Sequence, residues 1–240
     1  MLLAAKFALG PVLLRQGRAV RRTALRLPEP AGPRHGVAGG GEPRLRLLLV
    51  GDSSAAGVGL QHQSQALALP LANVLAQRLD GAVAWQLLAE TGLDTRGAQA
   101  LVGRSDVAAA DVVVTVLGVN DVTSQQAARG FVAETARLWT QVRQRTGARW
   151  AVVCGLPPME LLTAMPQPLR WYLGRYASGL DAALRGWAGD EGLGFCSLHW
   201  AADPSLLAPD GFHPGAALYP LWAQRLADLI AGERARWAPP

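Results

Sequence analysis

The sequence predicts an α/β protein, a three-layer α/β/α sandwich built around a five-stranded parallel sheet. Three features predict it. From residue 44 onward, five apolar runs of strand length alternate with segments of helical periodicity. Two of these runs, Leu45–Val50 and Asp111–Leu117, are almost wholly apolar, as in central strands covered on both faces. With 240 residues, half of them hydrophobic, the chain can build one large core.

The first strand, Leu45–Val50, ends at Gly51 and runs into Asp52, Ser53 and Ser54, residue types that cap helix N-termini. A helix follows over Ser64–Leu79, with Pro70 suited to its first turn. The later strands are expected at Val83–Ala89, Asp111–Leu117, Arg149–Cys154 and Phe195–Leu198. The later helices are expected at Thr95–Gly103, at Ser124–Arg145, within Leu169–Ala188 and at Ala216–Arg234. In such a sheet the carboxyl ends of the strands meet at one edge, where ligands bind.

The charge divides the chain into an N-terminal arm, residues 1–43, and a body, residues 44–240. Residues 1–46 carry Lys6 and eight arginines against two glutamates, a net charge of +7, whereas the remainder sums to −2. A nucleic-acid-binding domain would need its basic face on the folded body, so no nucleic-acid partner is expected. Residues 28–43 are rich in proline and glycine and are expected to form a flexible linker.

The start of the arm has an apolar stretch, Met1–Leu14, that is too short to span a bilayer and lacks the features of a signal peptide. Four arginines follow it, between Arg15 and Arg22. This order suits a segment lying in the membrane interface, and equally an amphipathic helix packed on the body or a frayed tail. We expect a cytoplasmic protein with peripheral contact to the inner face of the membrane through residues 1–22. Cys154 and Cys196 both end apolar strand-like runs and are expected to be buried thiols. A disulfide is the less favoured alternative, and metal binding is less favoured still because no CxxC pair is present.

A candidate nucleophile, Ser53, lies at the carboxyl end of the first strand, although a simple helix cap would explain it too. A nucleophilic serine needs a base, and an acid that orients the base. His213 is favoured as the base because Asp210 precedes it by three residues in a turn closed by proline. His199, at the end of the fifth strand, is a competitor.

Two further residues follow strand ends on the same edge. Asn120 comes after the strand Asp111–Leu117, and Gly92 comes after the strand Val83–Ala89. The Asn120 amide can donate to an oxyanion, together with the backbone N–H groups of Gly92 and Ser53. The alternatives are an Asx-type turn at Asn120 and a merely flexible turn at Gly92.

The segment Leu156–Leu173 leaves the sheet at this edge and is apolar, yet four prolines make a long helix through its first part unfavourable. Met159 and Met165 are expected to line a groove for flexible acyl chains, since methionine adapts its shape. The alternative is that these side chains pack over the end of the sheet.

Four blocks of the chain, in order and over about residues 44–235, resemble those of the SGNH (GDSL-type) hydrolase family. They are Gly51-Asp52-Ser53-Ser54, Gly92, Gly118-Val119-Asn120-Asp121 and Asp210-Gly211-Phe212-His213. The resemblance implies a flavodoxin-like fold in which Ser53 is the nucleophile, His213 the general base and Asp210 the residue that orients it. It also implies an oxyanion hole formed by Ser53, Gly92 and Asn120, with no metal or other cofactor. Ser54 stands where the usual block has leucine.

The function expected from these features is that of an esterase. It would cleave small-molecule carboxylic esters or thioesters through an acyl-enzyme. Apolar acyl groups of lipid-like or lysophospholipid-like substrates are expected. Two alternatives are an acyltransferase with the same triad and a non-catalytic, membrane-tethered ligand-binding module. The oligomeric state does not follow from the sequence.

Overall fold

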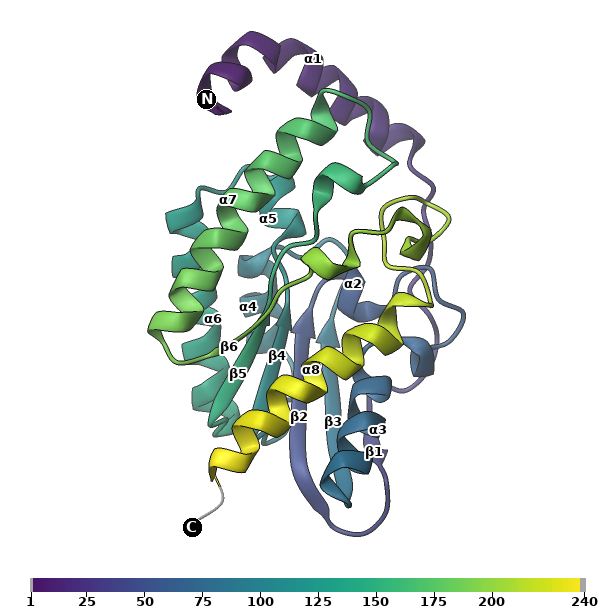
Figure 1. Ribbon diagram of the computed structural model, residues 1–240, viewed down its shortest axis with the longest axis vertical. Helices are drawn as coiled ribbons and strands as arrows, with labels where there is room; N and C mark the ends of the chain where they lie inside the picture. The colour runs from purple at the N-terminus through teal and green to yellow at the C-terminus, as the bar shows by residue number, and fades with distance from the viewer. Residues whose placement is uncertain (1, 238–240) are drawn as a thin grey trace.

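The computed structural model describes residues 2–237, in which one six-stranded sheet lies between two layers of helices (Figure 1). Its strand order is β1-β3-β2-β4-β5-β6. Strands β2 to β6 run parallel to one another, and β1 runs antiparallel to β3 at the edge. The strands are β1 (His35–Ala38), β2 (Pro43–Gly51), β3 (Ala82–Ala89), β4 (Val112–Val116), β5 (Trp150–Cys154) and β6 (Gly194–Cys196).

The two faces of β2 explain its unbroken apolar run. Leu47 and Leu49 point into one core, beneath α3 (Ala68–Leu79) and α8 (Leu218–Arg234). Leu48 and Val50 point into the opposite core. The helices on that second face are α4 (Thr95–Arg104), α6 (Ala128–Thr146) and α7 (Leu169–Asp190). The predicted three-layer architecture is therefore confirmed.

The predicted sheet is one strand short, because β1 lies within residues 28–43, which were expected to be a flexible linker. His35 pairs with Gln86 and Ala38 with Val83 of β3. Ahead of β1, the Glu29 carboxylate accepts hydrogen bonds from the backbone N–H (2.7 Å) and the hydroxyl (2.6 Å) of Thr91. A four-residue strand is too short to show periodicity between its prolines and glycines. The segment is thus an ordered part of the body.

The helix predicted over Ser124–Arg145 begins four residues later, as α6, and a short helix, α5 (Val119–Thr123), ends just ahead of the predicted start. They are separated at Gln125, which adopts a positive φ of 61°. Tyr172 and Tyr176 of α7 hold this turn, because their hydroxyls donate to the side-chain and main-chain oxygens of Gln125 (2.7 and 3.0 Å). Tertiary contacts from a distant helix therefore override the local helical pattern. The helix α3 begins at Ala68, with the expected proline in its first turn.

A long helix, α1 (Leu2–Thr23), lies across one end of the molecule against α7 (Figure 1). Of the alternatives that the sequence leaves open, the structure therefore has a helix packed on the body. The Gln16 side chain donates to the Gln167 carbonyl (2.6 Å) and accepts from the Leu169 N–H (3.0 Å). Within residues 2–237, no helix has both the length and the apolar character needed to cross a membrane.

The two cysteines lie side by side in the sheet. Cys154 of β5 and Cys196 of β6 are register partners, and both are buried free thiols. This confirms the expectation from the sequence.

Candidate active site

Ser53 is placed by a sharp turn from β2 into the four-residue helix α2 (Ser53–Ala56). Gly51 is required here: a Cβ would lie 2.4 Å from the Ala55 side chain and 2.8 Å from the Val116 carbonyl. Asp52 caps α2, because its side chain accepts a hydrogen bond from the Ser54 N–H (2.9 Å). The result is a serine side chain held at the carboxyl end of the central strand.

The base and the acid come from one turn ahead of α8. The Asp210 side chain accepts hydrogen bonds from the N–H groups of Phe212 and His213, both at 3.0 Å, and these bonds fix the turn. Gly211, with φ at 65°, packs so closely on the loop after β5 that a Cβ would lie 2.5 Å from the Thr163 hydroxyl. The turn is thereby anchored at the edge of the sheet where Ser53 lies.

These three side chains form one hydrogen-bonded chain across 160 residues of sequence. His213 Nδ1 lies 2.6 Å from Asp210 Oδ2, and His213 Nε2 lies 3.0 Å from Ser53 Oγ. Because a carboxylate can only accept, Nδ1 donates to Asp210 and Nε2 accepts from the Ser53 hydroxyl. An imidazole so placed can take the serine proton as the oxygen attacks.

The charge on Asp210 suits this arrangement. Burial alone would raise the pKa of its carboxyl, but the hydrogen bonds from the His213 side chain and from two backbone N–H groups outweigh burial and lower the pKa. Asp210 is therefore ionised near neutral pH and can orient the imidazole.

The competing histidine lies elsewhere. His199 Nε2 is 3.6 Å from Asp181 Oδ2, and its side chain is about half exposed. His62 caps the short 3₁₀ turn Gln63–Gln65 through its Nδ1 atom. The structure thus brings His213, and neither of these two, to Ser53.

Asn120 lies in α5 and reaches across the site instead of capping its own turn. Its Nδ2 donates to the Leu93 carbonyl at 2.8 Å and makes a longer contact, 3.4 Å, with Asp52 Oδ2. Asn120 also lines the pocket beside Ser53. The Asx-turn alternative is therefore not what the structure shows.

Gly92 lies in an exposed turn after β3, with φ at 85°, and a Cβ there would meet nothing within 4 Å. It is not among the residues that line the pocket. Its role in an oxyanion hole stays a prediction.

Two buried carboxyls at the site were not singled out from the sequence beyond capping and turn roles. Burial raises the pKa of Asp52 to about 7, and the negative charge of the neighbouring Asp121 raises it further. Hydrogen bonds from Ser54 act in the opposite direction. Burial also raises the pKa of Asp121 to about 6, while hydrogen bonds from Thr95 act in the opposite direction. Asp121 accepts from the Thr95 hydroxyl (3.0 Å) and N–H (3.1 Å). It thus ties the start of α4 to α5.

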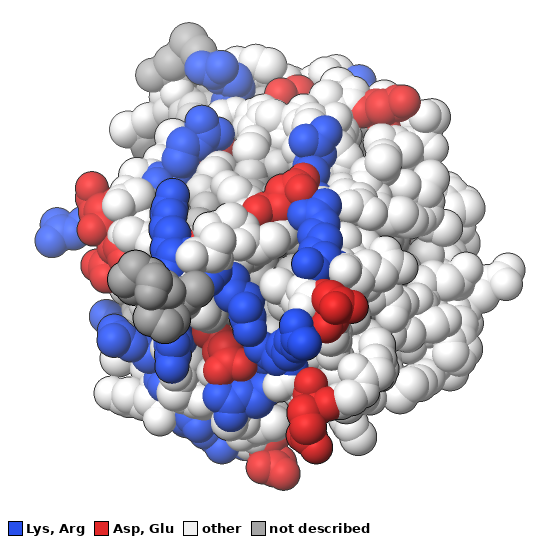
Figure 2. Space-filling model, turned by 60° about the horizontal axis from the view of Figure 1, so that its bottom comes forward, with Lys and Arg blue, Asp and Glu red and all other residues white. Residues whose placement is uncertain are grey.

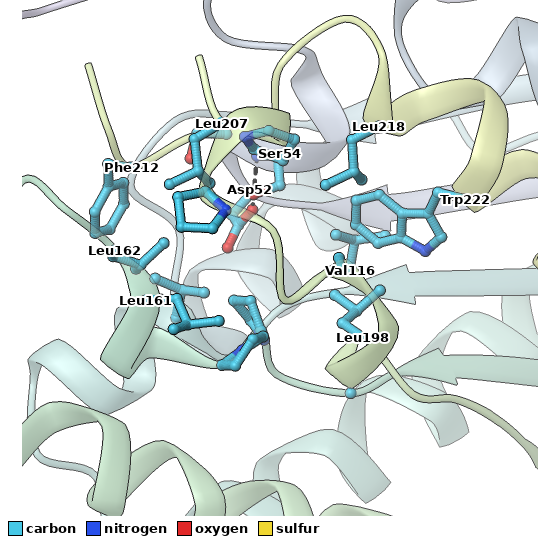
Figure 3. A pocket seen from close by; sticks show the side chains of 18 of the residues that line it. Asp52, Ser54, Val116, Leu161, Leu162, Leu198, Leu207, Phe212, Leu218 and Trp222 are labelled. Atoms are coloured by element: carbon cyan, nitrogen blue, oxygen red, sulfur yellow. Dashed lines mark hydrogen bonds between the residues drawn. The ribbon is translucent and has the colours of Figure 1, made fainter. Parts of the chain in front are cut away.

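The pocket beside Ser53 is mostly apolar. In Figure 3, Leu161, Leu162 and Phe212 lie on one side of Asp52, and Leu218 and Trp222 lie on the other. The side chains on the Trp222 side are buried, whereas Leu161 and Phe212 are partly exposed. The pocket therefore has an open end and a buried apolar end.

The segment after β5 forms part of this wall, but not through the residues that were predicted. Met159 and Met165 are buried in a core shared with α7, and neither lines the pocket. The short 3₁₀ turn Met159–Leu161 packs against α7, so Met159 turns inward while Leu161 and Leu162 face the pocket. The structure therefore does not place Met159 and Met165 on the pocket wall, where they were expected.

In the part of the chain that the structure describes, no three His, Cys, Asp or Glu side chains are grouped so that they could hold a metal ion.

Known proteins resemble this chain in sequence and in fold. The GDSL-like esterase Rv1075c of Mycobacterium tuberculosis is 30% identical in an alignment of 192 residues that covers 76% of this chain. This chain spans only 60% of the length of that relative. Two solved structures share the fold. TesA has a TM-score of 0.56 at 22% identity and covers 77% of this chain and 97% of its own. The esterase EstA from Pseudoalteromonas sp. has a TM-score of 0.58 at 19% identity, and the match covers 79% of this chain and 98% of EstA.

The profile of the GDSL-like lipase/acylhydrolase family matches residues 49–221. This span begins in β2, just ahead of Ser53, and ends in α8, beyond His213. The matched region therefore holds the whole hydrogen-bonded chain from Ser53 to Asp210, and this chain belongs to the GDSL-like lipase/acylhydrolase family of hydrolases.

Proposed function

We propose that this protein is a serine esterase that cleaves carboxylic esters through an acyl-enzyme. One observation carries the proposal. The Ser53 hydroxyl, the His213 imidazole and the Asp210 carboxylate are joined by hydrogen bonds of 3.0 and 2.6 Å beside an apolar pocket. Membership in a family of lipases and acylhydrolases supports it.

In the first half of the reaction, Ser53 Oγ attacks the ester carbonyl carbon while His213 Nε2 takes the hydroxyl proton. The imidazolium that forms keeps its Nδ1–H bond to Asp210, whose negative charge stabilises it. His213 then gives the proton to the departing alkoxide, and the alcohol leaves behind an acyl group bound to Ser53.

The negative charge that develops on the carbonyl oxygen needs hydrogen-bond donors. The Asn120 amide lies at the pocket, and only one of its two N–H bonds is committed at short distance, to the Leu93 carbonyl. The contact of Nδ2 with Asp52 is long, 3.4 Å, so the second N–H is the donor proposed for the oxyanion. The backbone N–H groups of Ser53 and Gly92 complete the proposed set of donors.

In the second half, water attacks the acyl carbon while His213 takes its proton, and the acid leaves as Ser53 recovers its hydrogen. The acyl chain is proposed to lie in the buried end of the pocket, near Trp222 and Leu218. Apolar walls favour apolar acyl groups, such as those of lipid-like esters. The expected partner is thus a small-molecule ester.

Turnover of p-nitrophenyl butyrate tests this proposal. Ser53→Ala is expected to reduce kcat by about a thousandfold or more, since the members of a triad act as a unit. Ser178→Ala is the matched control, because this serine lies on the exposed side of α7 and only bonds to its own helix. Equal turnover by wild type and Ser53→Ala would overturn the proposal. If added alcohols receive the acyl group faster than water does, the protein is an acyltransferase with the same nucleophile.

A further inference from the structure

The helix α1 presents two apolar faces, and only one of them is covered. The covered face packs on α7, with Leu13 buried and Leu9 partly buried. The hydrogen bonds of Gln16 to residues 167 and 169 lock the rotation of the helix. The other face therefore has a fixed direction, away from the body.

The outer face carries three large apolar side chains that the fold leaves in solvent. Leu3, Phe7 and Leu14 are 67%, 79% and 63% exposed. Their spacing of four and seven residues places them along one side of a helix. Trp171, which lies two residues after the N–H that binds Gln16, adds a partly exposed aromatic ring near this helix. A contiguous exposed apolar stripe of this kind marks an interaction surface.

Positive charge accompanies the stripe. The first acidic residue of the chain is Glu29, and six cationic side chains precede it. Within residues 2–237, none of the six forms an ion pair with a carboxylate. They are Lys6, Arg15, Arg18, Arg21, Arg22 and Arg26.

At the opposite end of the molecule, cationic side chains have acidic neighbours. Figure 2 shows arginines there interleaved with acidic side chains. Arg46 is paired with Asp111, and Arg78 with Asp228. The charge on α1 is therefore a local excess of one sign.

The stripe lies at the same end of the molecule as the pocket. Of the two residues that bind Gln16, Gln167 lies in the loop between β5 and α7, and Leu169 is the first residue of α7. The same loop supplies Leu161 and Leu162 to the pocket wall. After α1, the chain passes beside the turn that follows α2, where the Pro28 carbonyl accepts a hydrogen bond from the Gly59 N–H (3.1 Å). Figure 1 shows α1 lying over this end of the sheet.

We propose that α1 docks the protein on an anionic lipid surface, so that the pocket receives ester substrates held in that surface. Leu3, Phe7 and Leu14 would enter the boundary between headgroups and acyl chains, and the arginines would contact the anionic headgroups. The docking itself stands on the geometry and charge of α1. Only the delivery of substrate rests on the proposed esterase function.

Sedimentation of the full chain with vesicles tests the docking. We expect binding to phosphatidylglycerol vesicles that weakens with added salt, and much weaker binding to phosphatidylcholine vesicles. Phe7→Ser/Leu14→Ser should reduce binding at least tenfold. The matched control is Val37→Ser, an apolar side chain 58% exposed on the edge strand β1, which should leave binding unchanged.

A second pair of variants tests the charge. Arg18→Gln/Arg21→Gln should weaken binding by about fivefold for each arginine removed. Arg129→Gln/Arg143→Gln removes the same charge from exposed positions of α6 and should have little effect. Equal binding to neutral and anionic vesicles, or equal loss in both pairs, would overturn the proposal.

Two controls separate the possible failures. If the stripe instead joins two copies of the chain, a concentration-dependent dimer that Phe7→Ser/Leu14→Ser abolishes would be seen without vesicle binding, and the proposal would be wrong. Turnover of water-soluble p-nitrophenyl butyrate should be unaffected by Phe7→Ser/Leu14→Ser. If wild-type protein binds vesicles but does not cleave that ester, the esterase proposal fails and the docking stands.

Discussion

The buried carboxyl of Asp52 should make the protein less stable as the pH rises through neutrality. Its pKa is raised to about 7 in the folded protein, chiefly by burial, whereas an exposed aspartate ionises near 3.8. Between these two values the folded state binds a proton that the unfolded state has lost. The free energy of unfolding therefore falls as pH rises over this range and levels off above pH 7.

The size of the effect follows from the shift. Between pH 5 and pH 8.5, a change in pKa from 3.8 to about 7 corresponds to a loss of about 3 kcal/mol of stability. Asp121, with a pKa raised to about 6, acts in the same direction over a narrower range. Glu134 acts in the opposite direction, since hydrogen bonds from Gln99 and Arg96 lower its pKa to about 2. The contribution of Glu134 to stability changes only below about pH 4.5, which lies outside the range from pH 5 to pH 8.5.

Urea unfolding at pH 5, 6, 7 and 8.5 measures the effect, first on wild type and then on Asp52→Asn. Asparagine keeps the oxygen that accepts from the Ser54 N–H but cannot ionise. Between pH 5 and pH 8.5, the free energy of unfolding should fall by about 3 kcal/mol less in the variant than in wild type. An identical pH dependence in wild type and Asp52→Asn would refute the reasoning, because Asp52 would then have the same pKa in the folded and unfolded states.

Three further predictions concern catalysis. His213→Ala should reduce turnover of p-nitrophenyl butyrate by about a thousandfold, whereas His199→Ala should leave it nearly unchanged; the reverse result would make His199 the base. Asn120→Ala should lower kcat by about a hundredfold, the effect of one lost oxyanion donor, and an unchanged kcat would leave Asn120 a structural residue only. For wild type, kcat/KM should rise from acetate to butyrate and hexanoate esters by up to about fourfold per methylene, because the pocket near Trp222 is apolar. A steady fall from acetate onward would show that this pocket does not accept acyl chains.

The central strands were predictable because burial on both faces leaves a strong signal in the sequence. The run Asp111–Leu117 and the strand β4 (Val112–Val116) nearly coincide. The edge strand β1 was missed because His35-Gly36-Val37-Ala38 is short and half exposed. The start of α6 was predicted four residues too early because the turn at Gln125 is held by hydrogen bonds from the tyrosines of α7, which lie far along the sequence.

At the site, the proximity of Ser53, Asp210 and His213 followed from the parallel topology and from the turn that carries the last two. The direction in which individual side chains point did not follow from the sequence. Met159 and Leu161 are two residues apart in an apolar loop, and only packing against α7 decides which one faces the pocket. The burial of Asp52 could not be predicted either, because aspartate side chains are mostly exposed.

The most direct test of the esterase mechanism is to find which atom of the protein reacts with a fluorophosphonate. A fluorophosphonate reacts with a serine hydroxyl that a neighbouring base activates. We expect one adduct per chain, located on the peptide that contains Ser53, and no adduct in Ser53→Ala. Labelling should be much slower in His213→Ala, because the serine then lacks its base. An adduct on another residue, or none on wild type, would contradict the account.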